Sequence, residues 1–132
     1  AETVGLSRDL EGLLPLLERA GIAYTHERGQ GTSPPRIGLT RASGLLAETG
    51  SLIIDNENPG ERLWSIISGV HIAILNKPVV FKDLDSLFAG NSSILDRGFC
   101  LISGPSRTAD IEKQLVLGMH GPKRVVTIIA GQ

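Results

Sequence analysis

From residue 36 onward, short apolar runs alternate with short stretches that have helical periodicity. The apolar runs are rich in valine and isoleucine, which favour strands, and the clearest of them are residues 52–55, 72–75, 99–103 and 124–130. Strands that alternate with helices are typical of a mostly parallel sheet covered on both faces and joined by right-handed crossovers. We therefore predict an α/β fold of three layers, α/β/α, with a mostly parallel sheet of about six strands.

The length of 132 residues is enough for one domain with a buried core, so we predict a single domain over residues 1–132. Within it, residues 1–35 should form a helix, a strand and a loop, and residues 36–132 the core. The net charge of −1 argues against nucleic-acid binding, and no apolar run reaches the roughly 18 residues of a membrane span. Cys100 is the only cysteine, which excludes a disulfide within the chain and favours the cytoplasm as its location.

The N-terminal segment is predicted to be helical. Five leucines between residues 6 and 17 recur at helical spacing, with Ser7 suited to cap the helix and Gly21 suited to end it. Pro15 lies inside this pattern and predicts a kink or two short helices, because proline has no backbone N–H to donate. A short strand over residues 22–26 and a polar loop over residues 27–35 should follow.

Three further short helices are predicted in the core. The first is capped by Ser43 and ends at Ala47, and the second begins at residues 58–61, where asparagine, proline and glutamate form a good helix start. The buried stripe of the second helix is predicted to be Leu63, Ile66, Ile67 and Val70. Asp83 is suited to cap the third, which Gly90 ends. Its core-facing residues are predicted to be Leu84, Leu87 and Phe88.

The stretch from residue 104 to residue 122 carries more functional groups than a connection between two strands needs. Arg107 follows a predicted strand, and a guanidinium beside the free N–H groups of a helix start can bind a carboxylate or phosphate. We predict an anion site here, formed by Ser106, Arg107, Thr108 and Asp110. The alternative is that Arg107 pairs with Asp110 and only fastens the turn, while the two hydroxyls cap a helix.

Residues 108–120 can be interpreted in two ways. Leu115–Leu117 could finish a helix that begins near Thr108, or could be a short extended run, and periodicity cannot separate these for so brief a segment. We favour the helix, because Asp110 and Glu112 would lie in its first turn, where the helix dipole favours negative charge.

Three titratable residues are candidates for catalysis. Glu48 lies in a tight polar insertion, beside Thr49 and Gly50, and could act as an acid, a base or a nucleophile. An exposed glutamate with no such role is the favoured alternative. His71 and His120 could each act as a general base or a ligand, although a histidine at a strand entry is more often structural. Their spacing is not that of a metal site, and we predict no metal and no other cofactor.

Strand topology separates these candidates. Arg107 follows a strand and belongs at the carboxyl edge of the sheet, where ligands of parallel sheets usually bind. Glu48 and His71 precede strands and belong toward the opposite edge. His120, a whole helix later, would lie about 15 Å from Arg107, at 1.5 Å per residue. One pocket cannot hold all of them unless residues 108–120 are not a plain helix or a second subunit brings the edges together.

Four short motifs together resemble the LUD domain, the family of the lactate-utilisation C-type proteins (LutC/YkgG). They are residues 47–51, 70–72, 104–112 and 118–122. The most specific signal is the block 104–112 with Gly-x-His-Gly-Pro behind it, and the resemblance runs from about residue 36 to residue 130. Ser51 stands where threonine is common, and the proline usual before the Val-His pair is absent. Family members are usually longer at the N-terminus, so the chain resembles a short member or a trimmed domain.

The resemblance implies a fold similar to the NagB/RpiA/CoA-transferase group, in agreement with the three layers predicted above. It also implies a non-redox role in bacterial L-lactate oxidation to pyruvate beside iron–sulfur partner proteins, since Cys100 alone cannot hold a cluster. The expected partners are these proteins and a small anionic ligand, with a homo-oligomer left open. One alternative is an independent enzyme similar to a CoA transferase or sugar-phosphate isomerase, with Glu48 as nucleophile or base, by fold-level analogy. A ligand-sensing module is the other.

Overall fold

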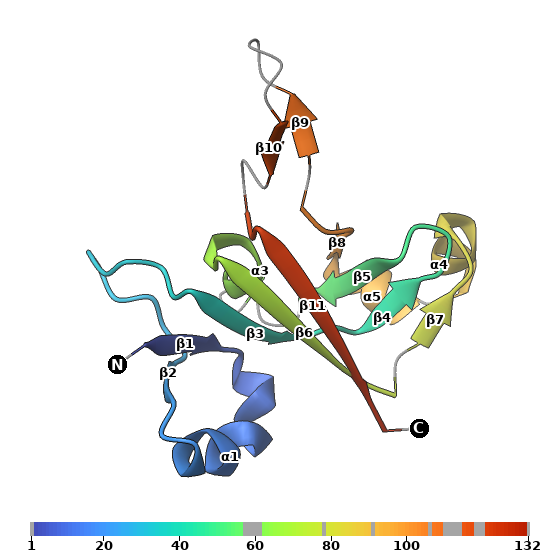
Figure 1. Cartoon of the computed structure of the whole chain (residues 1–132). Coiled ribbons are helices and arrows are strands. Elements are labelled where there is room, and N and C mark those ends of the chain that lie inside the picture. Colours follow the sequence, from blue (N-terminus) through green and yellow to red (C-terminus); the bar gives the residue numbers. More distant parts are fainter. Residues whose placement is uncertain are drawn as a thin grey trace.

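A computed structural model describes residues 2–56, 62–77, 79–90, 92–105, 107–109, 115–117 and 121–131. Its main sheet has five strands in the order β11–β6–β3–β1–β2, and every neighbouring pair is parallel (Figure 1). The strands are β1 (Thr3–Leu6), β2 (Ala23–Thr25), β3 (Ile37–Arg41), β6 (Val70–Asn76) and β11 (Arg124–Ala130). The α/β class with a mostly parallel sheet is thereby confirmed, with five strands where about six were expected.

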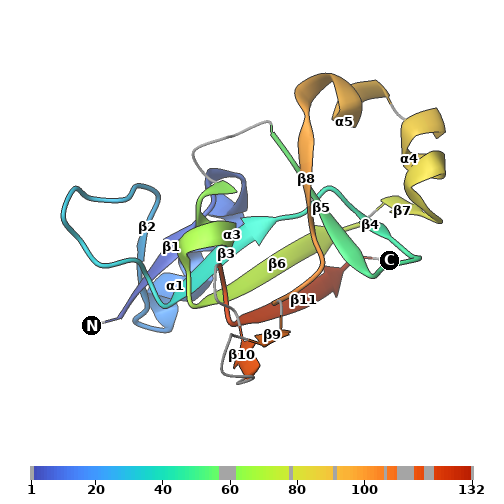
Figure 2. The same ribbon diagram turned by 90° about the horizontal axis from the view of Figure 1, so that it is seen from above.

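Four other strands form a second, mixed sheet in the order β7–β4–β5–β8 (Figure 2). They are β4 (Gly44–Leu46), β5 (Ser51–Asp55), β7 (Val79–Phe81) and β8 (Phe99–Ile102). β5 is antiparallel to both β4 and β8, whereas β4 and β7 are parallel. The sequence placed β5 and β8 in the parallel sheet. In the structure they pair antiparallel with each other in the second sheet, because the turn after β4 takes the chain back along β4 to form β5 there, and β8 adds to the other edge of β5.

The predicted helix from Ser43 to Ala47 is wrong, because this segment contains β4. Gly44 and Leu46 are buried while the residue between them is only partly so, which is the alternation of a strand. The Ser43 hydroxyl donates to the Asp55 carboxylate on β5, at 2.9 Å, instead of capping a helix. A side chain that bonds across to the next strand favours the extended pairing.

The helical elements are short. They are the 3-10 helix η1 (Arg8–Leu13) and the α-helices α1 (Leu14–Arg19), α3 (Trp64–Ile67), α4 (Leu84–Gly90) and α5 (Ser92–Arg97). The two short helices predicted from Pro15 are confirmed, but the first leucine of the pattern, Leu6, is fully buried in β1. Ser7 makes no capping bond, since its hydroxyl donates to Asp9. In the described part of the chain, no helix is long and apolar enough to cross a membrane.

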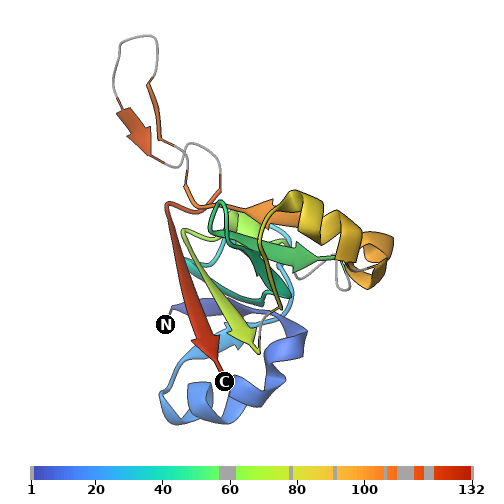
Figure 3. The same cartoon turned by 90° about the vertical axis from the view of Figure 1, so that its right-hand side faces the viewer.

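The main sheet, the second sheet and α4–α5 form successive layers (Figure 3). Between the two sheets lies one apolar cluster, formed by Ala42, Leu52, Ile54, Ala73 and Leu75. The other cluster lies between the second sheet and the helices and consists of Leu46, Ile53, Phe81, Leu87 and Ile94. Alternate residues of β4 and β5 therefore contribute to opposite clusters, so the second sheet is covered on both faces.

The helix α3 packs against the main sheet through Trp64, which is 1 % exposed. Gly5 and Gly38 are paired in neighbouring strands, and a Cβ on Gly5 would lie 2.6 Å from the Trp64 ring. The stripe predicted for this helix is partly wrong, because Ile66 is 52 % exposed and Trp64 takes the buried position. The predicted helix start at residues 58–61 lies outside the described residues.

The helix α4 begins as the sequence predicts. Asp83 Oδ1 accepts hydrogen bonds from the Ser86 hydroxyl at 2.6 Å and from the Ser86 backbone N–H at 2.8 Å. These two bonds lower the pKa of the Asp83 carboxyl, the hydroxyl having the larger effect. Leu87 is fully buried as expected, but Leu84 and Phe88 are exposed, so only one residue of the predicted stripe reaches the core.

The favoured helix over residues 108–120 is wrong, and the extended alternative is correct. β9 (Arg107–Ala109) and β10 (Leu115–Leu117) form an antiparallel pair in which Thr108 lies opposite Val116. Strand pairing between these two segments therefore outweighs the local charge pattern that favours a helix. Figures 1 and 3 show the two strands projecting away from the two sheets.

A hydroxyl-lined hollow as candidate functional site

A hollow of about 310 Å³ lies between the turn that joins β4 to β5, the segment after β8, and β11. The residues that shape it are Gly50, Ser103, Gly104, Pro105, Val125 and Thr127. It forms because the second sheet covers the main sheet incompletely. Ala73 on β6 is fully buried under that sheet, whereas its neighbour Thr127 on β11 is exposed.

Three hydroxyl groups form a chain at one side of the hollow. Ser51 Oγ lies 2.6 Å from Thr49 Oγ1 and 2.6 Å from Ser103 Oγ. Ser51 is buried, whereas Thr49 and Ser103 are exposed. A hydroxyl both donates and accepts hydrogen bonds, so the three groups polarise one another, and Ser103 keeps capacity for a ligand.

Two glycines keep the walls of the hollow open. Gly50 has φ +67° and Gly104 has φ +112°, conformations that residues with a side chain rarely adopt. Apart from the adjacent residues in the chain, no heavy atom of the described residues lies within 4 Å of the position that a Cβ would take at either glycine. Their backbone N–H and C=O groups are therefore approachable by a small polar molecule.

His71 lies on β6, paired with the lining residue Val125. Its ring is fully buried, Nε2 lies 2.7 Å from Thr40 Oγ1, and Nδ1 has no partner among the described residues. We assign the proton to Nε2, which donates to Thr40, because an unpaired acceptor costs less than an unpaired N–H. Burial lowers the pKa of His71 from 6.5 to about 4, so the ring is neutral near pH 7.

The structure brings together some of the predicted site residues. Gly50 lines the hollow, and Thr49 is linked to it through Ser51 and Ser103. Glu48 beside them is exposed, with its backbone N–H donating to the Lys82 carbonyl at 3.0 Å. The predicted separation of this turn from the segment before Ser106 is wrong. β5 is antiparallel to β8, so the start of one strand lies beside the end of the other.

The other candidates lie on or beyond the β9–β10 ribbon. Arg107 and Thr108 belong to β9, which begins two residues after Pro105. Ser106, Asp110 and His120 lie outside the described residues. The anion site predicted around Arg107 and the catalytic roles of Glu48, His71 and His120 stay predictions. Among the described residues, no three His, Cys, Asp or Glu side chains are grouped to hold a metal ion.

Sequence reasoning missed Ser51, Ser103 and Thr127. Each is a small hydroxyl residue inside or at the end of an apolar run, where strand pairing alone would accept an apolar residue. That local inconsistency is the signal that could have identified them.

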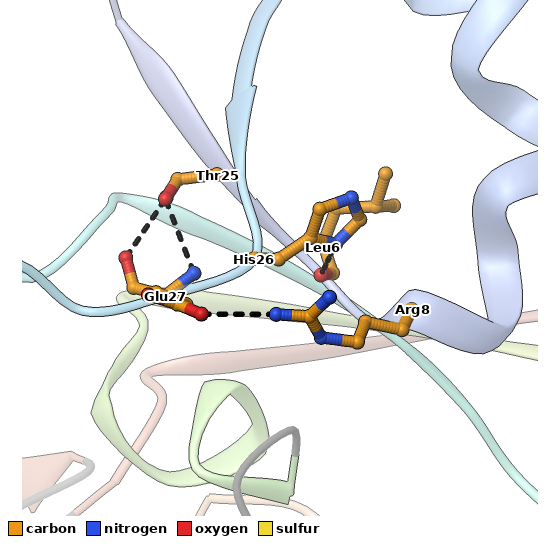
Figure 4. A network of polar contacts seen from close by, with 5 residues as sticks. All are labelled: Leu6, Arg8, Thr25, His26 and Glu27. Atoms are coloured by element: carbon orange, nitrogen blue, oxygen red, sulfur yellow. Dashed lines mark hydrogen bonds and ion pairs between the residues drawn. The ribbon is translucent and has the colours of Figure 1, made fainter.

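A second hollow, of about 420 Å³, lies beside the loop after β2, with Glu27 and Trp64 among its lining residues. The Glu27 carboxylate is paired with Arg8 at 3.0 Å, and the Glu27 carbonyl accepts from the Thr25 hydroxyl at 2.8 Å (Figure 4). His26 Nδ1 donates to the Leu6 carbonyl at 2.8 Å. The Arg8–Glu27 and His26–Leu6 contacts connect the loop to the N-terminal segment. The Glu27 carboxylate, which lines this hollow, is therefore already paired with Arg8.

The fold and the first hollow define an α/β domain with a surface hollow lined by two glycines and two hydroxyl residues. The model of the LUD domain matches residues 35–130, and the chain belongs to the LUD domain family. The match includes the Thr49–Ser51–Ser103 hydroxyl chain and β11, so the hollow lies within the part of the chain that defines the family.

Two relatives are named lactate utilization protein C. The protein from Halalkalibacterium halodurans is 32 % identical over 132 residues, with 92 % of this chain and 57 % of the relative covered. The protein from an Exiguobacterium species is 38 % identical over 101 residues, with 70 % of this chain and 43 % of the relative covered. The chain thus spans about half the length of the curated relatives it matches.

A solved structure supports the fold. The crystal structure of a DUF162 family protein from Deinococcus radiodurans has a TM-score of 0.55, with 98 % of this chain and 86 % of that chain covered. The identity of 18 % means that this likeness concerns the fold alone.

Proposed function

We propose that this chain acts in lactate utilisation and holds a small carboxylate, such as lactate or pyruvate, in the hollow between Gly50 and Gly104. The observation that carries the proposal is the Thr49–Ser51–Ser103 hydroxyl chain beside that hollow. A carboxylate accepts several hydrogen bonds, and the lactate hydroxyl can donate one. Relatives named lactate utilization protein C support this class of ligand.

The charge of the ligand needs a counter-charge, and none of the residues described around the hollow is charged. Arg107 lies two residues after Pro105, and we propose that its guanidinium supplies the charge by pairing with the carboxylate. Asp110 would compete for the same guanidinium, so the ligand must offer better geometry than that side chain.

We further propose that redox chemistry takes place on iron–sulfur partner proteins. The chain has one cysteine, Cys100, whose thiol lies 3.7 Å from the Ile54 carbonyl inside the fold. A cluster is held by several cysteine thiolates, so electrons from lactate would pass to a partner. Purification of the chain together with such proteins tests this step, and a clean failure to associate would count against it.

Ligand-induced thermal stabilisation tests the carboxylate site. Lactate or pyruvate at 100 times its Kd should stabilise the parent by about 2.7 kcal/mol, and phosphate and CoA provide the comparison. Ser103→Ala should weaken binding, because one hydrogen bond contributes about 1 kcal/mol. Ser33→Ala is the matched control, since Ser33 lines the second hollow. If no carboxylate stabilises the parent, or both variants lose binding equally, the proposed site is wrong.

Acyl transfer from a CoA ester, with Glu48 as nucleophile, is a second candidate. It is favoured by one observation: Glu48 is exposed and directly precedes Thr49, which begins the hydroxyl chain. The Glu48 carboxylate would attack the thioester carbonyl, so that the C–S bond breaks, CoA leaves as its thiolate and an acyl-glutamyl anhydride forms. This adduct, detected by mass spectrometry after incubation with acyl-CoA and absent in Glu48→Gln, would support this chemistry. Carboxylate binding that Glu48→Gln leaves unchanged, with no adduct on the parent, supports the first proposal.

A further inference from the structure

The strand β11 is an open edge of the main sheet. It is seven residues long and pairs with β6 along its whole length, and no other strand in the described part of the chain pairs with it. Residues 127–130 are exposed, with Ile128 at 47 % and Ile129 at 57 %. No residue from 125 to 130 is charged. A long apolar edge without charge is a template for pairing with another strand.

The backbone of β11 presents a defined set of groups to that edge. The Lys77 N–H donates to the Ala130 carbonyl at 3.1 Å, so Ala130 directs its peptide groups toward β6. Peptide groups alternate in direction along a strand. Val125, Thr127 and Ile129 therefore direct their N–H and C=O groups toward the open side.

The sequence of β11 is self-complementary about Thr127. If a second β11 runs antiparallel to the first across a twofold axis at Thr127, Val125 lies opposite Ile129 and Val126 lies opposite Ile128. Each pair joins two β-branched residues, which are favourable cross-strand neighbours. The three edge-facing residues form hydrogen-bonded pairs, each of which exchanges two N–H···O bonds.

We propose that two copies of this chain associate through antiparallel β11 strands centred on Thr127, forming a continuous sheet of ten strands, five from each copy. Charge permits this arrangement, because Arg124 lies opposite Ala130 of the second copy and the two Arg124 Cα atoms are about 20 Å apart, at roughly 3.4 Å per residue. A twofold interface brings the same surface of both copies together, so that surface must be complementary to itself. The β11 edge meets this requirement, because the residue pairs from 125 to 129 on each face of the sheet are apolar or hydroxyl pairs.

The pairing would also complete the hollow. Opposed residues of an antiparallel pair face the same side of the sheet, so Ile129 of the second copy lies beside Val125. Val125 and Thr127 form the β11 wall of the hollow. The second copy therefore extends that wall on the side where β11 has no neighbour.

Sedimentation velocity on matched variants tests the association. The parent should be a dimer, and Ile129→Lys should weaken the dimer at least about tenfold, because it places a charge in the paired edge. Leu16→Lys is the control, since Leu16 is 59 % exposed on α1 and Ile129 is 57 % exposed. Both variants should retain the circular dichroism spectrum of the parent. A monomeric parent, or equal weakening by both variants, overturns the proposal.

Cysteine cross-linking tests the register. In a Cys100→Ala background, Thr127→Cys should form a disulfide-linked dimer, because Cα atoms of a hydrogen-bonded antiparallel pair lie about 5.5 Å apart, within disulfide range. Ile128→Cys should not, since residue 128 faces Val126 of the second copy. Equal cross-linking at both positions, or at neither, refutes the pairing about Thr127. Oligomers larger than a dimer also refute it, because a closed twofold interface ends at two copies.

Discussion

The free energy of unfolding should fall as the pH is lowered from 6.5 to about 4, because His71 is buried as a neutral ring. Its side chain has no exposed surface, and desolvation lowers its pKa from 6.5 to about 4. Thr40 is its only described hydrogen-bond partner, and no described carboxylate bonds to the ring to stabilise the charged form. Folding therefore favours the deprotonated imidazole.

The unfolded chain takes up a proton on this imidazole near pH 6.5, whereas the folded protein does so only near pH 4. Between these values the unfolded state binds more protons, so stability rises with pH in this window. The full contribution is present above 6.5. The gap corresponds to about 3 kcal/mol at 1.36 kcal/mol per pKa unit. Below pH 4 both states are protonated, and His71 adds no further loss.

Urea denaturation across this pH range measures the effect, with His71→Gln and His26→Gln as the paired variants. His71→Gln should lose the slope between pH 4 and 6.5, because glutamine has no proton to take up there. His26→Gln should keep it, because His71 and its buried surroundings are unchanged in that variant. A His71→Gln protein with the full parental slope, or an NMR titration that places the His71 pKa near 6.5, would refute the reasoning.

Two substitutions test the packing, each by urea denaturation against a matched control. Gly38→Ala should destabilise the fold by about 1–3 kcal/mol, because its Cβ would lie 2.7 Å from the Trp64 carbonyl oxygen, whereas Gly12→Ala meets no atom within 4 Å and should be neutral or stabilising. Equal effects would contradict the close packing of α3. Leu87→Ala should cost about 2–5 kcal/mol, and Phe88→Ala much less because Phe88 is 59 % exposed. A larger loss at Phe88 would mean that α4 faces the sheet differently.

The sequence predicts strands well where apolar residues form continuous runs. Residues 52–55, 72–75 and 124–130 lie within strands of the structure, and residues 99–102 of the predicted run 99–103 form β8. The pattern of apolar residues along the chain identifies such runs. It carries no information on which strands pair, and for this reason β5 and β8 were placed in the parallel sheet.

Short segments are where prediction fails. The strand β4 has three residues, and three residues fit a helical pattern as well as an alternating one. Its extended form depends on pairing with β5 and β7. The local pattern that suggested a helix capped by Ser43 contains neither of these strands. The same holds for Leu115–Leu117, whose partner is β9. Tertiary pairing decides such segments, and local propensity does not.

In the candidate site too, the local sequence indicates some residues, and only the pairing of distant strands reveals the others. Thr49 and Gly50 could be predicted because a polar insertion between apolar runs is conspicuous in a sequence. Ser51 and Ser103 could not, because each is a single hydroxyl at a strand end. Their importance lies in the 2.6 Å contact between them, and that contact exists only because β5 and β8 are antiparallel neighbours.

The position of the hollow follows from how far the second sheet extends. Ala73 and Leu75 on β6 are fully buried against Leu52 and Ile54 of the second sheet. The next strand, β11, is less covered by the second sheet. On the same face, Val125 is partly buried, whereas Thr127 and Ile129 are exposed. A strand whose last four residues are exposed, and whose outer edge pairs with no strand in the described part of the chain, is costly for a monomer. Here that same strand forms a wall of the hollow, so the surface that leaves room for a ligand is also the surface that a second copy would stabilise.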